Sequence, residues 1–418
     1  MFDWANSAYN LVITSTIFPA YYTAVTLTKE HGDVVDFFGW KVVNTALSNF
    51  ALAFSYLFMA CILPFLSSYA DLRGQKKNLM MLFTSIGALA CMGLFFFRLE
   101  TLEQSILFFA LAAMGYIGGV LFNNAYLPEI ATVDQQDRVS ALGFTYGYIG
   151  CVTLQLICLL FIIKPDWFGI VDPSFGPRLS FLLVGLWWIS FALIPFKVLP
   201  HNPKSKVPAA RSVFRTVLLE YRIVWRRIAR MESIRRFLPA YFFYSAGVQT
   251  VMIVAAAFGA KELQLESHKL IITILLIQLV AILGAYLMSR LAMRFGNIKV
   301  LIAVVCLWIG VCVSAFFIGS EIEFYVLACL VGLVMGGIQS LSRSTYSKFL
   351  PENTRDTVSF FSFYDITEKL AIVLGLFSFG LIEQFTHNIR YSALFLSLFF
   401  IMGCGLLFRL LRYNQAMR

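Results

Sequence analysis

The chain has 418 residues, of which 59% are hydrophobic and only 13% are charged, and its formal net charge is +10. Soluble domains carry roughly 25% charged residues, so this chain lacks the polar surface that a soluble protein of its length needs. The composition excludes a soluble enzyme or binding module and indicates a polytopic membrane protein.

Apolar stretches of about 20 residues, each long enough to cross a bilayer, recur along the whole chain. Short polar breaks separate them, and they predict an all-α polytopic membrane protein with twelve transmembrane helices. The eleventh is unusual because it contains charged residues. The predicted spans are 7–27, 44–66, 79–97, 104–127, 139–163, 179–199, 237–258, 269–289, 297–318, 322–345, 357–382 and 391–411.

Most of the excess positive charge lies in residues 200–236, between the sixth and seventh spans. This segment has ten basic residues against Glu220 and Glu232. Loops rich in Lys and Arg stay in the cytoplasm, which places this segment and both termini inside and makes a nucleic-acid partner unnecessary to explain the charge. The basic residues are Lys204, Lys206, Arg211, Arg215, Arg222, Arg226, Arg227, Arg230, Arg235 and Arg236.

Apolar residues interleave with these arginines, among them Val213, Val217, Ile223, Val224 and Trp225. An interfacial amphipathic helix that binds anionic lipid has this pattern. Two interpretations of 200–236 therefore stay open, a solvated linker that sets topology and a lipid-binding helix.

Motifs for metals and cofactors are missing from the sequence. All eight cysteines fall within predicted spans, where they act as small apolar residues. There is no CxxC motif or Cys/His cluster and no GxxxxGK[ST] nucleotide loop. We expect no cofactor, no metal and no structural disulfide, and we expect the first span to serve as its own insertion signal.

The basic segment divides the spans into six and six, and each half carries a related loop after its second span. Residues 69–77 read YADLRGQKK and residues 291–299 read LAMRFGNIK, with Ala, Gly and Lys aligned without gaps. The repeat predicts an N-terminal six-helix half at 1–199, a basic cytoplasmic linker at 200–236 and a C-terminal six-helix half at 237–418.

The first of these loops resembles the signature loop of the major facilitator superfamily, whose two six-helix halves enclose a central substrate site. The resemblance implies that the loop latches the cytoplasmic ends of the halves. Gly74 permits a tight turn, Asp71 can accept hydrogen bonds from a helix N-terminus, and Arg73 offers a planar fork to a carboxylate. With Arg138 they are the candidate cytoplasmic gate. In the second repeat, Met293 replaces the aspartate.

Three further blocks resemble the vacuole-effluxer-like family, also called the unknown major facilitator family. They are DWANSAYN at 3–10, NNAYLPEI at 123–130 with 138–140 and 147–150, and GGIQSLSRS at 336–344. The resemblance covers nearly the whole chain, and eukaryotic members are associated with amino-acid efflux from vacuoles. The chain begins at the first block, where relatives carry several residues before it.

Polar side chains inside apolar spans are costly, which makes each a candidate functional residue. Asp3, Asn6 and Asn10 share one face of the first helix by their spacing. Either Asp3 only caps the first turn, or this face binds substrate or a coupling ion. Asn123, in the fourth span, either contacts substrate or joins helices.

The eleventh span contains Asp365, Glu368 and Lys369. Asp365 and Lys369 are four apart and are expected to pair. Glu368 is then unmatched and becomes the first candidate for proton binding, because burial disfavours a charged carboxylate. The alternative is a structural ion pair near the cytoplasmic interface.

The leading prediction is a secondary active or facilitative transporter that moves a small polar solute by rocker-switch alternating access. Protons are the candidate coupling ion, and amino acids are the solute that the family resemblance implies. The rivals are a polytopic membrane enzyme and a transporter-like receptor without solute flux. His31, His201, His268 and His387 all lie in loops, and no GxSxG or HExxH motif occurs, so we predict no enzyme activity. We expect a multi-pass monomer in a membrane, which for a bacterial source is the cytoplasmic membrane.

Overall fold

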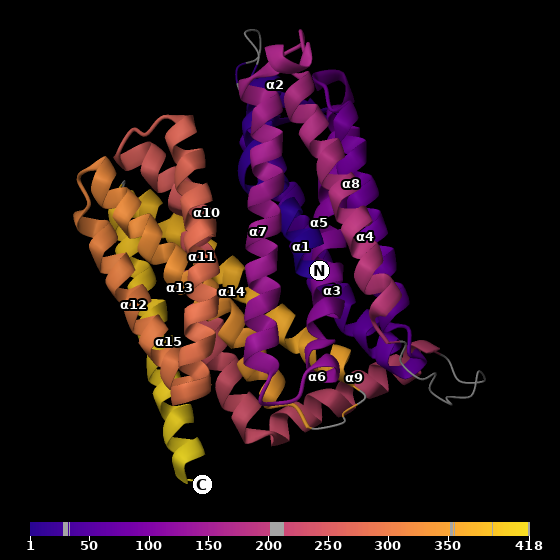
Figure 1. Ribbon diagram of the computed structural model, residues 1–418, viewed down its shortest axis with the longest axis vertical. Coiled ribbons are helices and arrows are strands. Elements are labelled where there is room, and N and C mark those ends of the chain that lie inside the picture. Colours follow the sequence, from indigo (N-terminus) through magenta and orange to yellow (C-terminus); the bar gives the residue numbers. More distant parts are fainter. Residues whose placement is uncertain are drawn as a thin grey trace. The chain divides into compact units, whose positions relative to one another are not determined.

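The structure, a computed structural model, describes residues 1–27, 32, 34–200, 213–351, 354, 356–386 and 388–416, without the side chains of 213–218, 220, 257, 267 and 268. Long helices dominate the described part of the chain (Figure 1). Within that part, ten helices are long and apolar enough to cross a membrane. The two other predicted spans are also helical: the first is interrupted, and the eleventh, α14, carries the charged residues.

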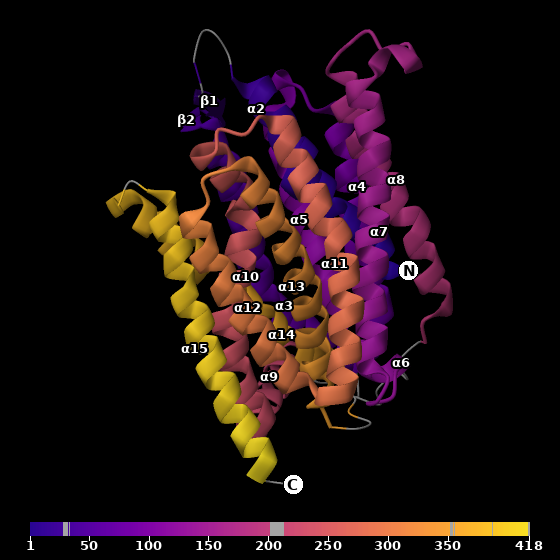
Figure 2. The same ribbon diagram turned by 60° about the vertical axis from the view of Figure 1, so that its left-hand side comes forward.

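The first predicted span consists of α1 (Phe2–Ala8), a π-helical stretch (Tyr9–Thr16) and α2 (Ile17–Thr26). The antiparallel hairpin of β1 (Val34–Phe37) and β2 (Trp40–Val43) follows and leads into the next helix (Figure 2). Short 3-10 turns lie at Leu94–Phe96, Leu99–Thr101 and Pro165–Phe168. The remaining helices of this part are α3 (Asn44–Arg73), α4 (Lys76–Gly93), α5 (Leu102–Asn124), α6 (Leu127–Ile130), α7 (Gln136–Ile163) and α8 (Phe175–Val198).

The described residues from 213 onward form seven helices. They begin with the basic helix α9 and continue with six helices of 21 to 31 residues. Each predicted span of this part lies within one of these six helices, apart from one residue at the end of the span 297–318. The seven are α9 (Val213–Arg230), α10 (Glu232–Glu262), α11 (Ser267–Phe295), α12 (Asn297–Phe317), α13 (Glu321–Lys348), α14 (Thr357–Thr386) and α15 (Ile389–Ala416).

By compactness the chain forms two units, residues 1–123 with 146–207, and residues 124–145 with 208–418. The sequence places all of 1–199 in one half. In the structure, residues 124–145 group with the second unit, and they include α6 and the first turns of α7.

Helix α9 contains most of the described part of the basic segment, and Arg235 and Arg236 lie at the start of α10. Lys204, Lys206 and Arg211 lie outside the described residues. Helix α9 packs on α10 and α14 within the second unit. Val224 and Ile228 are buried, and Tyr221 and Trp225 pack their rings on Phe363 of α14. The apolar positions that interleave with the arginines are therefore partly used in packing against the protein.

Glycine allows the closest helix contact in the second unit, between α11 and α13. A Cβ atom on Gly284 would lie 2.0 Å from the Leu333 carbonyl oxygen, and one on Gly336 would lie 2.1 Å from the Ala281 carbonyl oxygen. Small residues spaced four apart let membrane helices approach in this way. In the first unit, Gly115 of α5 makes a comparable contact with Gly87 of α4.

Candidate functional site

Three charged side chains of α14 and an amide of α10 form the α14 charge cluster (Asp365, Glu368, Lys369 and Gln249), in which Asp365 and Lys369 are buried and Glu368 and Gln249 are half-buried. Lys369 Nζ lies 2.9 Å from Glu368 Oε2 and 3.6 Å from Asp365 Oδ1. Gln249 Nε2 donates a hydrogen bond of 2.9 Å to Glu368 Oε1. The structure thus brings together all three residues that the sequence singled out on this helix and adds Gln249.

The pairing inside the cluster differs from the one expected from helical spacing. Lys369 is closer to its chain neighbour Glu368 than to Asp365, one turn away, because its long stem can bend back toward either carboxylate. Glu368 therefore has a partner at each oxygen, whereas Asp365 Oδ2 accepts no hydrogen bond from the described residues.

Aromatic side chains lie next to the cluster. The Tyr241 ring of α10 stacks on Tyr364 of α14 with centroids 4.2 Å apart. Tyr244 and Ser342 share a hydrogen bond of 2.7 Å, and the Tyr346 hydroxyl donates to the Phe360 carbonyl over 2.6 Å. These bonds tie α10, α13 and α14 together beside the charged groups.

The polar face of the first helix lies in the other unit. Asn123 Nδ2 donates to Asp3 Oδ1 over 3.1 Å, so α5 and α1 are joined at two of the predicted positions. Asn6 is buried and its Nδ2 atom donates no hydrogen bond to the described residues, while Asn10 is half-buried at the π-helical stretch. These contacts do not identify a substrate or an ion that Asn6 or Asn10 binds.

The π-helical stretch is a feature that sequence reasoning missed. Thr16 donates to the Leu11 carbonyl, five residues back, over 2.7 Å, and also to the Gln155 side-chain oxygen of α7 over 2.9 Å. Such stretches are rare and occur frequently at functional sites. The polar block at 3–10 was visible in the sequence, but nothing in it indicated the wider helical turn.

The loop between α3 and α4 forms the tight turn predicted for Gly74. This residue ends α3 in the left-handed conformation, φ +63°, and Gln75 N donates to the Ala70 carbonyl over 2.9 Å. Asp71 and Arg73 are half-buried, and Arg138 is exposed.

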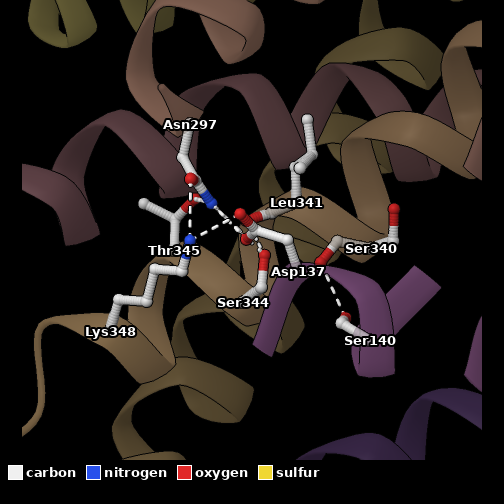
Figure 3. Close-up of polar contacts among 8 residues, drawn as sticks. All are labelled: Asp137, Ser140, Asn297, Ser340, Leu341, Ser344, Thr345 and Lys348. Atoms are coloured by element: carbon white, nitrogen blue, oxygen red, sulfur yellow. Dashed lines mark hydrogen bonds and ion pairs between the residues drawn. The ribbon is translucent and has the colours of Figure 1, made fainter. Parts of the chain in front are cut away.

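The polar group that sequence reasoning missed is the α7–α12–α13 cluster (Asp137, Asn297 and Lys348). Figure 3 shows the carboxylate of Asp137, in the first turn of α7, facing both Asn297 of α12 and Lys348 of α13. Asp137 is 1% exposed; its Oδ1 accepts from Asn297 Nδ2 and its Oδ2 accepts from Lys348 Nζ. Lys348 also donates to Asn297 Oδ1 over 3.0 Å.

A buried arginine continues this cluster along α13. Arg343 donates to the Ser140 carbonyl over 2.8 Å, to Ser140 Oγ over 3.0 Å and to Asn124 Oδ1 over 3.1 Å. Its guanidinium lies 4.4 Å from the centre of the Phe144 ring. Within the second unit, residues 124–145 are therefore held to α12 and α13 by the Asp137–Lys348 ion pair and by the hydrogen bonds of Asn297 and Arg343.

The whole chain matches a known protein family. A model of the family described as "Vacuole effluxer Atg22 like" matches residues 1–418. The uncharacterized MFS-type transporter YxiO of Bacillus subtilis (strain 168) is 30% identical over 414 residues, which are 97% of this chain and 92% of that protein. Autophagy-related protein 22 of Eremothecium gossypii is 26% identical, with coverage of 88% and 78%.

Solved structures agree on the fold. The transporter FucP in its outward conformation superposes with a TM-score of 0.71 at 14% identity, covering 98% of this chain and 96% of that one. The proton:xylose symporter XylE gives a TM-score of 0.73 at 12% identity, with coverage of 98% and 93%. These matches confirm the predicted fold class, and the chain belongs to the vacuole effluxer Atg22-like family of multi-pass membrane proteins with the major facilitator transporter fold.

Proposed function

We propose that this protein is a secondary transporter that moves a small polar solute by alternating access, as major facilitator proteins do. The observation that carries the proposal is the α14 charge cluster. Ionisable groups buried between apolar helices are expensive, and in membrane proteins they mark paths for substrates and ions. A scaffold with no solute to move would have no need of a buried and a half-buried carboxylate sharing one ammonium.

The names of the relatives support solute movement and a coupling ion. The Bacillus relative is described as an MFS-type transporter, and two structural neighbours are described as proton symporters. Amino acids are the solute class that we propose, on the resemblance to vacuole effluxers. A carboxylate and an ammonium group in one cluster match the two charged ends of such a zwitterion.

Purified protein in proteoliposomes tests this proposal. A mixture of the proteinogenic amino acids is supplied outside with an inward proton gradient, and mass spectrometry follows the vesicle contents. At least one component should accumulate above the level in protein-free vesicles, and collapsing the gradient should reduce that accumulation.

Two other outcomes would replace the proposal. If a component raises the melting temperature of the protein but never enters the vesicles, the protein is a receptor. If a solute or lipid is chemically converted, it is an enzyme.

We propose that the loop after α3 helps to latch the cytoplasmic side. Gly74→Leu should lower amino-acid uptake while leaving membrane insertion intact, because a side chain strains the left-handed turn. Asp71→Asn should act in the same direction.

The matched control for the latch is Gly169→Leu. Gly169 has the same φ of +63° and a Cβ there would meet nothing within 4 Å, but it lies in the loop between α7 and α8. If Gly74→Leu and Gly169→Leu reduce uptake equally, the effect is turn strain alone and the latch is rejected.

The charge distribution predicts that both termini and residues 200–236 are cytoplasmic. Lys206 and Arg418 lie outside the described residues, so the test uses reporter fusions at those points. A cytoplasmic reporter should be active at both, and an alkaline phosphatase fusion inactive. Phosphatase activity at either point contradicts the inside orientation.

A further inference from the structure

Asp365 carries the least satisfied charged group of the α14 charge cluster. The residue is 3% exposed, and Oδ2 accepts no hydrogen bond from the described residues. Oδ1 lies 3.6 Å from Lys369 Nζ, which is beyond hydrogen-bond distance. A buried carboxylate oxygen without a donor disfavours the ionised form, because the hydrogen bonds of water are lost and not replaced.

Glu368, in contrast, has a partner at each of its carboxylate oxygens. One oxygen lies 2.9 Å from the Lys369 ammonium and the other accepts from the Gln249 amide at 2.9 Å. Both oxygens of Glu368 therefore have a donor within hydrogen-bond distance, whereas Oδ2 of Asp365 has none among the described residues.

The cluster also has an excess of negative charge. Two carboxylates share one ammonium, so with all three groups ionised the net charge is −1. Among the described residues, the charged groups in electrostatic range of Asp365 are Lys369 and Glu368 of α14. On α10, the neutral Tyr241 lies near Glu368, and on α13, Arg343 lies near Tyr364 and is held by Ser140 and Asn124.

From this geometry we propose that Asp365, and not Glu368, is a proton-binding site, in which the proton adds to Oδ2. No other bond forms or breaks, and the cluster becomes neutral. The Lys369–Glu368 contact then remains as an internal ion pair, and the protonated Asp365 is a neutral acid in an apolar setting. The assignment reverses the one that helical spacing alone suggests.

The role of this proton in transport rests on the proposed function, but the site itself does not. If the protein is a proton-coupled transporter, Asp365 is the group that picks up the coupling ion, and Lys369 can move toward Asp365 whenever the proton leaves. If no solute is moved, the same carboxyl still binds a proton, so the two proposals can fail separately.

Infrared difference spectroscopy on the full-length protein in lipid nanodiscs tests the site with protons as the only ligand. Lowering the pH should produce the C=O stretching band of a buried carboxylic acid, distinguished from exposed acids by its slow response to deuterium exchange. Labelling the aspartate carboxyl carbon with carbon-13 should shift this band. The band should be lost in Asp365→Asn.

Asp356→Asn is the matched control, because it removes an aspartate from the start of the same helix, where Asp356 pairs with Arg227 of α9. This variant should keep the band. The proposal is overturned if carbon-13 glutamate shifts the band and Asp365→Asn retains it, since Glu368 is then the proton site. It is also overturned if wild-type protein shows no buried acid at any pH at which it stays folded.

Discussion

Gly284→Val should abolish folded protein. A Cβ atom at this position would lie 2.0 Å from the Leu333 carbonyl oxygen on α13, which is backbone and cannot rotate away. Overpacking a core costs about 1–3 kcal/mol where side chains can yield, and a backbone obstacle raises the cost above that range. We expect a strong loss of the monodisperse peak in fluorescence-detected size-exclusion chromatography.

Gly310→Val provides the control. Gly310 is in the middle of α12, in an exposed position where a Cβ would meet nothing within 4 Å. It receives the same side chain in the same kind of helix, so it should elute like wild type. Equal peaks for the two variants would show that α11 and α13 can separate without loss of the fold.

Hydropathy predicted the helices well because the membrane imposes one dominant constraint, that an apolar span must be helical. The span predicted at 269–289 lies inside α11 (Ser267–Phe295), and the one at 357–382 lies inside α14 despite its charges. The helix ends extend beyond the predictions, since polar turns that protrude from the apolar layer carry no hydropathy signal.

The hairpin at Val34–Val43 could not be found in the same way. It lies in a connecting loop, and its turn places Phe38 at φ +51°, a conformation usually taken by glycine, asparagine or aspartate. The sequence there offers an aromatic residue before Gly39, which is a weak turn signal.

The candidate site, too, was predictable from the sequence only in part. Asp365, Glu368 and Lys369 were predictable, because charges inside an apolar span are rare enough to be noticed. The sequence did not predict which carboxylate lies closer to the Lys369 ammonium. That depends on side-chain conformation and on Gln249, which is more than 100 residues away in the chain.

Asp137 and Lys348 were missed because they lie at helix ends. Charged residues there are ordinary, and the basic ones among them were already explained by the topology of the chain. The pair is separated by 211 residues, and the sequence gives no sign that Asp137 is buried while its neighbour Arg138 is exposed.

This ion pair leads to the second prediction. Lys348→Met should destabilise the protein by about 3–5 kcal/mol, because it leaves the Asp137 carboxylate buried without its cation. Asp137→Leu should cost less, since the Lys348 side chain is 21% exposed and can reach water. Denaturant unfolding of the wild type and the two variants in mixed micelles measures both differences in the free energy of unfolding.

The double variant Asp137→Leu with Lys348→Met decides whether burial of the charge causes the loss. It removes both charges and puts apolar side chains in their place, and Asn297 keeps contacts with the Ser344 and Thr345 hydroxyls at 3.4 and 3.2 Å. The double variant should therefore be more stable than Lys348→Met alone. Its loss of unfolding free energy should be smaller than the sum of the losses in the two single variants. If the double variant is the least stable of the three, packing at α7, α12 and α13, rather than an uncompensated charge, determines the stability of this cluster.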